Sequence, residues 1–91
     1  MEIEGRTAVV TGGAVRVGAA ISRELARRGA SVFIHYNRSS GPAEALRQEV
    51  VDAGGVAAIG SVDLSNPDEA HHLIEAAAAT LGAPSILVNS A

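Results

Sequence analysis

Short apolar runs rich in β-branched residues alternate with longer segments of helical periodicity along the chain. The first run, Thr7-Ala8-Val9-Val10, predicts a buried strand that ends at Thr11. Similar runs follow at residues 31–36, 56–62 and 85–89. Strands that alternate with helices predict a parallel sheet, because parallel neighbours need a crossover connection. The sequence therefore predicts an α/β fold with the element order βαβαβαβ.

The segments between these runs carry the apolar spacing and the end signals of helices. Asn66-Pro67-Asp68-Glu69 has the cap, first-turn proline and acid of a helix start, and Gly29 and Gly82 stand where helices end. Each helix is expected to turn one apolar stripe to the sheet. The predicted stripes are Val17, Ile21 and Leu25; Ala43, Leu46, Val50 and Ala53; and Ala70, Leu73, Ala77 and Leu81.

Right-handed crossovers place the first strand near the centre of the sheet. The expected strand order is 3-2-1-4, as in a doubly wound sheet of the Rossmann type. The fourth strand is apolar, and in a complete sheet of this type it has a neighbour on its outer edge. We therefore expect an incomplete sheet in which residues 1–91 are the N-terminal part of the domain. Its open edge would pair with the remainder of a longer protein or with a second copy.

Composition and charge exclude several classes of function. The net charge is −3 with interspersed signs, so the chain lacks the basic stripe of a nucleic-acid-binding protein. There are no cysteines, which excludes disulfides and thiolate metal sites, and the neighbouring His71 and His72 do not share a helix face. No apolar run approaches a membrane span, and residues 1–6 lack the apolar core of a signal peptide. We expect a cytoplasmic, soluble protein that binds no metal, membrane or nucleic acid.

The segment Thr11–Gly18 joins the first strand to the first helix, where a doubly wound fold binds a pyrophosphate at the helix N-terminus. Gly12 permits the sharp turn, and Gly18, without a Cβ, permits close packing. Gly13 and Gly18 also have Walker A spacing, but Ala19-Ala20 stand where lysine and serine or threonine are needed, so an NTPase is excluded. The alternative is an ordinary glycine-rich turn.

This loop resembles the T-G-x-x-x-G-x-G loop of the short-chain dehydrogenase/reductase family. Thr11, Gly12 and Gly18 match, and Arg16 replaces the middle glycine. Both this variant and the segment at residues 35–39, His-Tyr-Asn-Arg-Ser, are similar to pteridine reductases. The 3-oxoacyl reductases of fatty-acid synthesis share much of the pattern. The resemblance spans the chain and implies a parent enzyme that transfers hydride from NADPH to a C=O or C=N group.

The residues at the end of the second strand indicate whether such a fold selects NAD(H) or NADP(H). An NAD-selective fold carries an acidic residue there, about 20 positions after the loop, whereas this chain has Tyr36, Asn37, Arg38 and Ser39. A carboxylate repels a 2′-phosphate and a guanidinium binds it, so Arg38, together with Arg16, predicts NADP(H). The alternative is that both arginines are solvated surface charges.

The resemblance implies further contacts with the adenosine. Asp63 matches a family position at which an aspartate contacts the adenine amino group and the next backbone, here that of Leu64, contributes, although Asp63 could instead organise the turn. Asn89-Ser90-Ala91 resembles the start of the family segment N-N-A-G, in which Asn89 bridges strands or its backbone approaches the ribose. His35 is expected to pack against the sheet or its loop. The predicted cofactor-binding residues are Gly12, Arg16, Val17, Gly18, Tyr36, Asn37, Arg38, Ser39, Asp63, Leu64, Asn89, Ser90 and Ala91.

No catalytic residue is assigned within the chain. The resemblance implies a tyrosine with a lysine four positions later, usually with a serine, but the single tyrosine is Tyr36, residue 40 is serine, and the chain has no lysine. Three hypotheses follow. The chain is the cofactor-binding part of an NADPH-dependent carbonyl or pteridine-type reductase, a non-catalytic nucleotide-binding module, or a module for chain association.

Overall fold

The computed structural model describes residues 2–90, in which strands and helices alternate as the sequence predicts. The elements are β1 (Thr7–Thr11), α1 (Arg16–Arg27), β2 (Ser31–Tyr36), α2 (Ser40–Asp52), β3 (Val56–Ser61), α3 (Pro67–Leu81) and β4 (Ile86–Asn89). The predicted helix signals are present: the Asn66 side chain accepts a hydrogen bond from the amide of Asp68, and Gly29 has a positive φ after α1.

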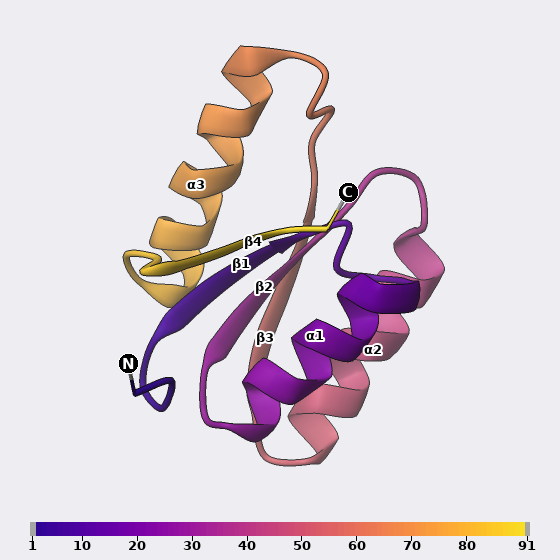
Figure 1. Ribbon diagram of the computed structural model, residues 1–91. Coiled ribbons are helices and arrows are strands. Elements are labelled where there is room, and N and C mark those ends of the chain that lie inside the picture. The colour runs from indigo at the N-terminus through magenta and orange to yellow at the C-terminus, as the bar shows by residue number, and fades with distance from the viewer. Residues whose placement is uncertain (1, 91) are drawn as a thin grey trace.

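The four strands form one parallel sheet in the order β3-β2-β1-β4, which confirms the predicted doubly wound topology. Helices α1 and α2 cover one face of the sheet and α3 covers the other (Figure 1). Because the strands are parallel, their carboxyl ends meet at one edge of the sheet. The loops that follow β1, β2, β3 and β4 therefore lie next to one another at that edge.

Two apolar clusters form the core, one on each face of the sheet. Alternation along β1 sends Val10 to the face covered by α1 and α2, and Val9 to the face covered by α3. Val32 and Ile34 of β2 join the first cluster, and Phe33 joins the second. Strands β1 and β2 are thus buried on both faces, and the loops that follow them begin in the core of the sheet.

The predicted stripe of α1 is wrong at its first position. Val17 is 68% exposed, whereas Gly18, Ala19, Ser22 and Leu25 are buried. Small side chains occupy the buried face because the start of α1 lies almost against the preceding loop. Two other stripe positions are also exposed, Ala53 just after α2 and Ala70 in the first turn of α3.

Strand β4 is covered much less than its neighbours. It pairs with β1, and along its length half-buried and exposed residues alternate, with Leu87 64% exposed. Within residues 2–90, β4 has no strand on its outer edge. None of the helices in this part of the chain has the length and apolar character needed to cross a membrane.

Candidate nucleotide-binding site

The loop between β1 and α1 has a backbone shape that depends on glycine. Gly12 has φ +62°, in the left-handed region. A Cβ added to Gly18 would lie 2.0 Å from the carbonyl oxygen of Gly12, and one added to Gly13 would lie 2.8 Å from that of Val10. The structure thus confirms the predicted turn at Gly12 and the close packing at Gly18, although Gly18 packs against the loop itself.

Arg16 adopts a conformation that normally belongs to glycine. Its φ is +53°, and it is the one non-glycine residue with a positive φ among residues 2–90. A side chain in the left-handed region costs about 1–2 kcal/mol. The family pattern T-G-x-x-x-G-x-G has a glycine here, so this chain keeps the backbone shape of that glycine and adds a guanidinium group.

Two buried polar side chains hold this loop in place. Ser22, fully buried in α1, donates to the carbonyl oxygens of Gly18 (2.8 Å) and Gly13 (3.2 Å). His35, 3% exposed near the end of β2, has Nδ1 3.0 Å from the Gly12 amide nitrogen. The contact confirms that His35 packs against the loop, but its bonding role was missed. The available signal is a lone ionisable residue inside a buried, apolar strand.

The ends of β1 and β4 are joined by side chains. The Thr11 hydroxyl donates to Oδ1 of Asn89 (2.9 Å) and accepts from the Ser90 amide (3.1 Å). This confirms the structural alternative for Asn89, which bridges two strands. The approach of its backbone to a ribose stays a prediction.

A cavity of about 390 Å³ opens above the loop, at the carboxyl edge of the sheet. Its walls come from the β1–α1 loop, from the segment after β2 and from the end of β4. Arg16 and Arg38 both line it, so the structure brings together the two arginines that the sequence pairs. The full lining is Gly12, Ala14, Val15, Arg16, Val17, Gly18, His35, Tyr36, Asn37, Arg38, Ser39 and Ser90.

Among the described residues, three of the predicted ones are not part of this lining. The Leu64 side chain packs in the apolar cluster under α3, and both Leu64 and Asn89 line a different cavity on that face. Asp63 accepts hydrogen bonds at Oδ1 from the hydroxyl (2.6 Å) and the amide (3.0 Å) of Ser65. Ala91 lies outside the described residues.

The environment of Asp63 supports the alternative that this residue organises the turn. The two hydrogen bonds from Ser65, and to a smaller degree the charge of Arg38, hold the pKa of the Asp63 carboxyl below its usual value. The contact between Asp63 and adenine stays a prediction. The hydrogen bond from the Ser61 hydroxyl to the Asn37 carbonyl oxygen (3.1 Å) shows that the end of β3 lies close to the segment after β2.

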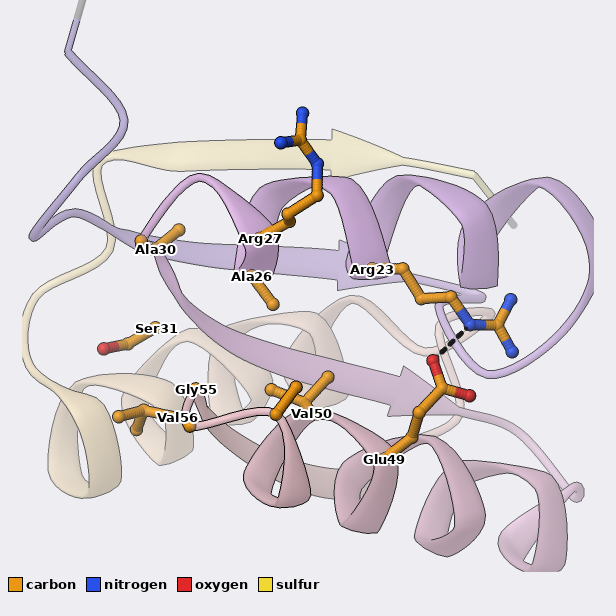
Figure 2. Close-up of a pocket in the computed structure, with 12 residues that line it drawn as sticks. Arg23, Ala26, Arg27, Ala30, Ser31, Glu49, Val50, Gly55 and Val56 are labelled. Atoms are coloured by element: carbon orange, nitrogen blue, oxygen red, sulfur yellow. Dashed lines mark hydrogen bonds and ion pairs between the residues drawn. The ribbon is translucent and has the colours of Figure 1, made fainter.

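A second cavity, of about 430 Å³, lies between the C-terminal halves of α1 and α2 and contains none of the predicted site residues (Figure 2). Arg23 donates from Nε to Oε2 of Glu49 (2.6 Å) at its rim. Arg27, which also lines it, pairs with Glu24. The arginines of this cavity are therefore already matched by carboxylates.

The arginines of the loop cavity differ in this respect. The ion-paired arginines among residues 2–90 are Arg23, Arg27, Arg28 and Arg47. In the same part of the chain, neither Arg16 nor Arg38 has a carboxylate within ion-pair distance. A cavity with two such guanidinium groups, at a helix N-terminus, suits a ligand with several phosphate groups.

Comparison with known proteins identifies the family to which this arrangement belongs. Residues 6–91 match the family model described as short chain dehydrogenase. The chain is a member of the short-chain dehydrogenase family. It is 40% identical over 91 residues to the short-chain dehydrogenase/reductase homolog YusS of Bacillus subtilis, covering 100% of this chain and 84% of that protein.

Solved structures of proteins from this family have the same fold as the chain. A dehydrogenase/reductase from Sinorhizobium meliloti superposes with a TM-score of 0.94 at 38% identity, over 99% of this chain and 36% of the other. FolM alternative dihydrofolate reductase 1 from Brucella canis, complexed with NADP, superposes with a TM-score of 0.88 at 35% identity. The superposition covers 94% of this chain and 34% of the other. The chain spans about a third of the length of these structures and of most curated relatives that it matches.

Proposed function

We propose that residues 1–91 are the N-terminal, NADP(H)-binding part of an NADPH-dependent reductase. The observation that carries the proposal is that Arg16 and Arg38, from separate loops, line one cavity above the glycine loop and have no carboxylate partner within residues 2–90. An NAD-selective site would place a carboxylate at the end of β2. Tyr36 occupies that position and no acid follows it before α2.

The loop geometry fits a pyrophosphate. Gly18 leaves the space that a Cβ would fill, so the N-terminus of α1 sits directly on the turn. The amides of Gly12 and Gly13 are already bonded to the His35 side chain and carbonyl oxygen. The amides of Val17 and Gly18, in the first turn of α1, are the donors that would hold the phosphates.

The remaining walls of the cavity suit the adenosine end of the dinucleotide. Arg16 and Arg38 would hold the 2′-phosphate by charge-assisted hydrogen bonds. The residues after β2, Tyr36, Asn37 and Ser39, would add neutral contacts around the same group. On the family resemblance, Asp63 and the Leu64 backbone would contact adenine, and Asn89, Ser90 and Ala91 would approach the ribose.

Bound NADPH would supply the hydride, and segments beyond residues 1–91 would supply the substrate pocket and the proton-donating tyrosine and lysine. The exposed apolar surface of β4 around Leu87 would pack against those segments or against a second copy. Brucella canis FolM, an NADP complex at 35% identity, and the arginine variant of the glycine loop favour a pteridine or ketoacyl-type substrate with a reducible C=N or C=O group.

Fluorescence titration with NADPH and NADH tests the cofactor assignment. We expect NADPH to bind at least tenfold more tightly than NADH, because one pair of charge-assisted bonds is worth about 1.5–3 kcal/mol. The preference should shrink with added salt, since it depends on exposed charges. Equal affinities, or tighter binding of NADH, would contradict the assignment.

The Bacillus subtilis homolog supports a second candidate function. This chain covers 84% of YusS but only 36% of an oxidoreductase from Methylorubrum extorquens, so the family contains proteins of very different length. The second candidate is a dinucleotide-binding protein that acts without a catalytic half. The test uses the protein in its full natural length. NADPH that binds to it but is not oxidised in the presence of pteridine or ketoacyl substrates would favour this candidate.

A further inference from the structure

One residue connects the glycine loop to two neighbouring strands. Nδ1 of His35 lies 3.0 Å from the Gly12 amide nitrogen, and Nε2 lies 3.0 Å from the carbonyl oxygen of Val62, just after β3. The carbonyl oxygen of His35 accepts from the Gly13 amide at 2.9 Å. Both amides of the Gly12-Gly13 turn are therefore bonded to this one residue of β2.

The two partners of the ring define its protonation state. The Gly12 amide can only donate, so Nδ1 must carry a lone pair, and the Val62 carbonyl can only accept, so Nε2 must carry the hydrogen. The ring is thus neutral and in the Nε2–H form. Adding a proton at Nδ1 would set two N–H groups against each other at 3.0 Å and remove the bond to Gly12. Because His35 is 3% exposed, water cannot readily replace that bond.

Each of the elements and segments near the ring carries other ionisable residues. Arg16 comes from the start of α1, Tyr36 and Arg38 from β2 and the segment after it, and Asp63 follows Val62 directly. The ionisable residues of α3 are Asp68, Glu69, His71, His72 and Glu75. Within residues 2–90, none of these side chains forms a hydrogen bond or ion pair with the ring, and Asp63 is bonded to Ser65 instead.

We propose that the neutral His35 imidazole is a positioning residue that holds the glycine loop in its phosphate-binding shape, so that protonation of this ring releases the loop and weakens dinucleotide binding. The expected change in dinucleotide affinity rests on the proposed function, whereas the expected effect on the loop does not. Because one proton is linked to the release of the loop, protonation of the ring weakens binding by up to about tenfold per pH unit.

A matched pair of variants separates this role from simple packing. In His35→Asn, Oδ1 takes the place of Nδ1 as an acceptor for the Gly12 amide and does not titrate between pH 5 and 8. His35→Gln places its amide at the position of Nε2 instead and leaves Gly12 without its acceptor. We expect His35→Asn to bind NADPH at least tenfold more tightly than His35→Gln at pH 8.

The pH profile of NADPH binding then tests the proton. The 2′-phosphate itself titrates near pH 6, so the decisive quantity is the difference between the original protein and His35→Asn measured side by side. As the pH falls from 8 to 5, the affinity of the original protein should decrease more steeply than that of His35→Asn. Identical profiles for the two proteins, or equal binding by the Asn and Gln variants at pH 8, would overturn the proposal.

Nuclear magnetic resonance on the unmodified protein provides a test that needs neither variant nor ligand. The ¹⁵N shifts of the His35 ring should report the Nε2–H form at pH 8, and hydrogen exchange of the Gly12 amide should accelerate as this ring is protonated. An Nδ1–H ring, or Gly12 exchange that does not follow the ring, would overturn the positioning role. If both signals appear as expected and NADPH does not bind, the proposed function fails and the positioning role stands.

Discussion

Two cavities of similar volume, about 390 and 430 Å³, lie at opposite ends of the sheet, and each is lined by two arginines. In the cavity between α1 and α2, Arg23 pairs with Glu49 (Figure 2), and Arg27 pairs with Glu24. In the loop cavity, Arg16 and Arg38 have no such partner among residues 2–90. The contrast teaches that uncompensated charge, and not volume, distinguishes a candidate anion site.

The backbone conformations of the residues that line the two cavities also differ. Gly29 and Gly54, at the α1–α2 cavity, have positive φ where helices end, which is their ordinary use. At the loop cavity, Gly18 permits a contact that no other residue would permit, and Arg16 holds a strained conformation. Strain that serves no packing purpose tends to be kept where it serves binding.

The largest effect is expected from Gly18→Ala. The new Cβ would lie 2.0 Å from the Gly12 carbonyl oxygen, so the loop must move, and we expect a loss of about 3 kcal/mol in the free energy of unfolding. Urea denaturation measures it. The control is Gly41→Ala in α2, where a Cβ meets nothing within 4 Å, and about 0.5–1 kcal/mol of stabilisation is expected. Equal stability of the two variants would show that the loop is not tightly packed.

Exchanging charge at each cavity tests the contrast between them. Arg38→Asp should weaken NADPH binding by about 1–3 kcal/mol, the value of a lost charge-assisted bond, and leave NADH binding unchanged or improved. Arg23→Asp makes the same change in charge at the other cavity and breaks an exposed ion pair, which costs about 0–1 kcal/mol of stability. Titration of both variants with both dinucleotides gives the comparison. If the two variants lost the same NADPH affinity, binding would depend on the net charge of the protein and not on the position of Arg38.

Arg16→Gly should act in opposite directions on stability and binding. Removing the side chain relieves a φ of +53°, and we expect about 1 kcal/mol of added stability. NADPH should bind more weakly, because one guanidinium group is lost from the cavity. Denaturation and titration on the same sample measure the two effects. A variant that is less stable than the original would show that Arg16 makes a stabilising contact that outweighs the strain.

The smallest effect is expected from Glu24, at the ion-paired end of the molecule. Hydrogen bonds from Arg27 and then Arg28 lower the pKa of Glu24 from its ordinary value of 4.5 to about 2. A lowered pKa in the folded state means that the stabilisation is present above pH 4.5 and is lost as the pH falls toward 2. Glu24→Gln should therefore lower the free energy of unfolding by a small, salt-sensitive amount at pH 7 and leave it almost unchanged at pH 2. A carboxyl resonance of Glu24 that titrates at the ordinary pKa would contradict the pairing.

Much of the fold could be predicted from local patterns. The apolar runs and capping residues such as Asn66 indicate the elements, and the handedness of crossovers determines the strand order, because these depend on neighbours in sequence and on chirality. The α1 stripe was wrong at Val17, since apolar spacing does not reveal how closely a helix lies to the loop before it. The Leu64 side chain packs under α3, a position that the sequence did not indicate, and the contact of its backbone with the adenosine stays a prediction.

For the candidate site, the sequence likewise indicated properties of single positions but not contacts between distant segments. The residue types at Gly12, Gly18 and Arg38, and the absence of an acid after the second strand, were readable in the sequence because each is a property of one position. Only the tertiary structure decided that Arg16 keeps a left-handed backbone, and that His35 accepts from the Gly12 amide while its far nitrogen meets Val62. Those features depend on segments brought together by the parallel sheet, and hydrogen bonds between segments that are distant in sequence leave no periodic pattern in the chain.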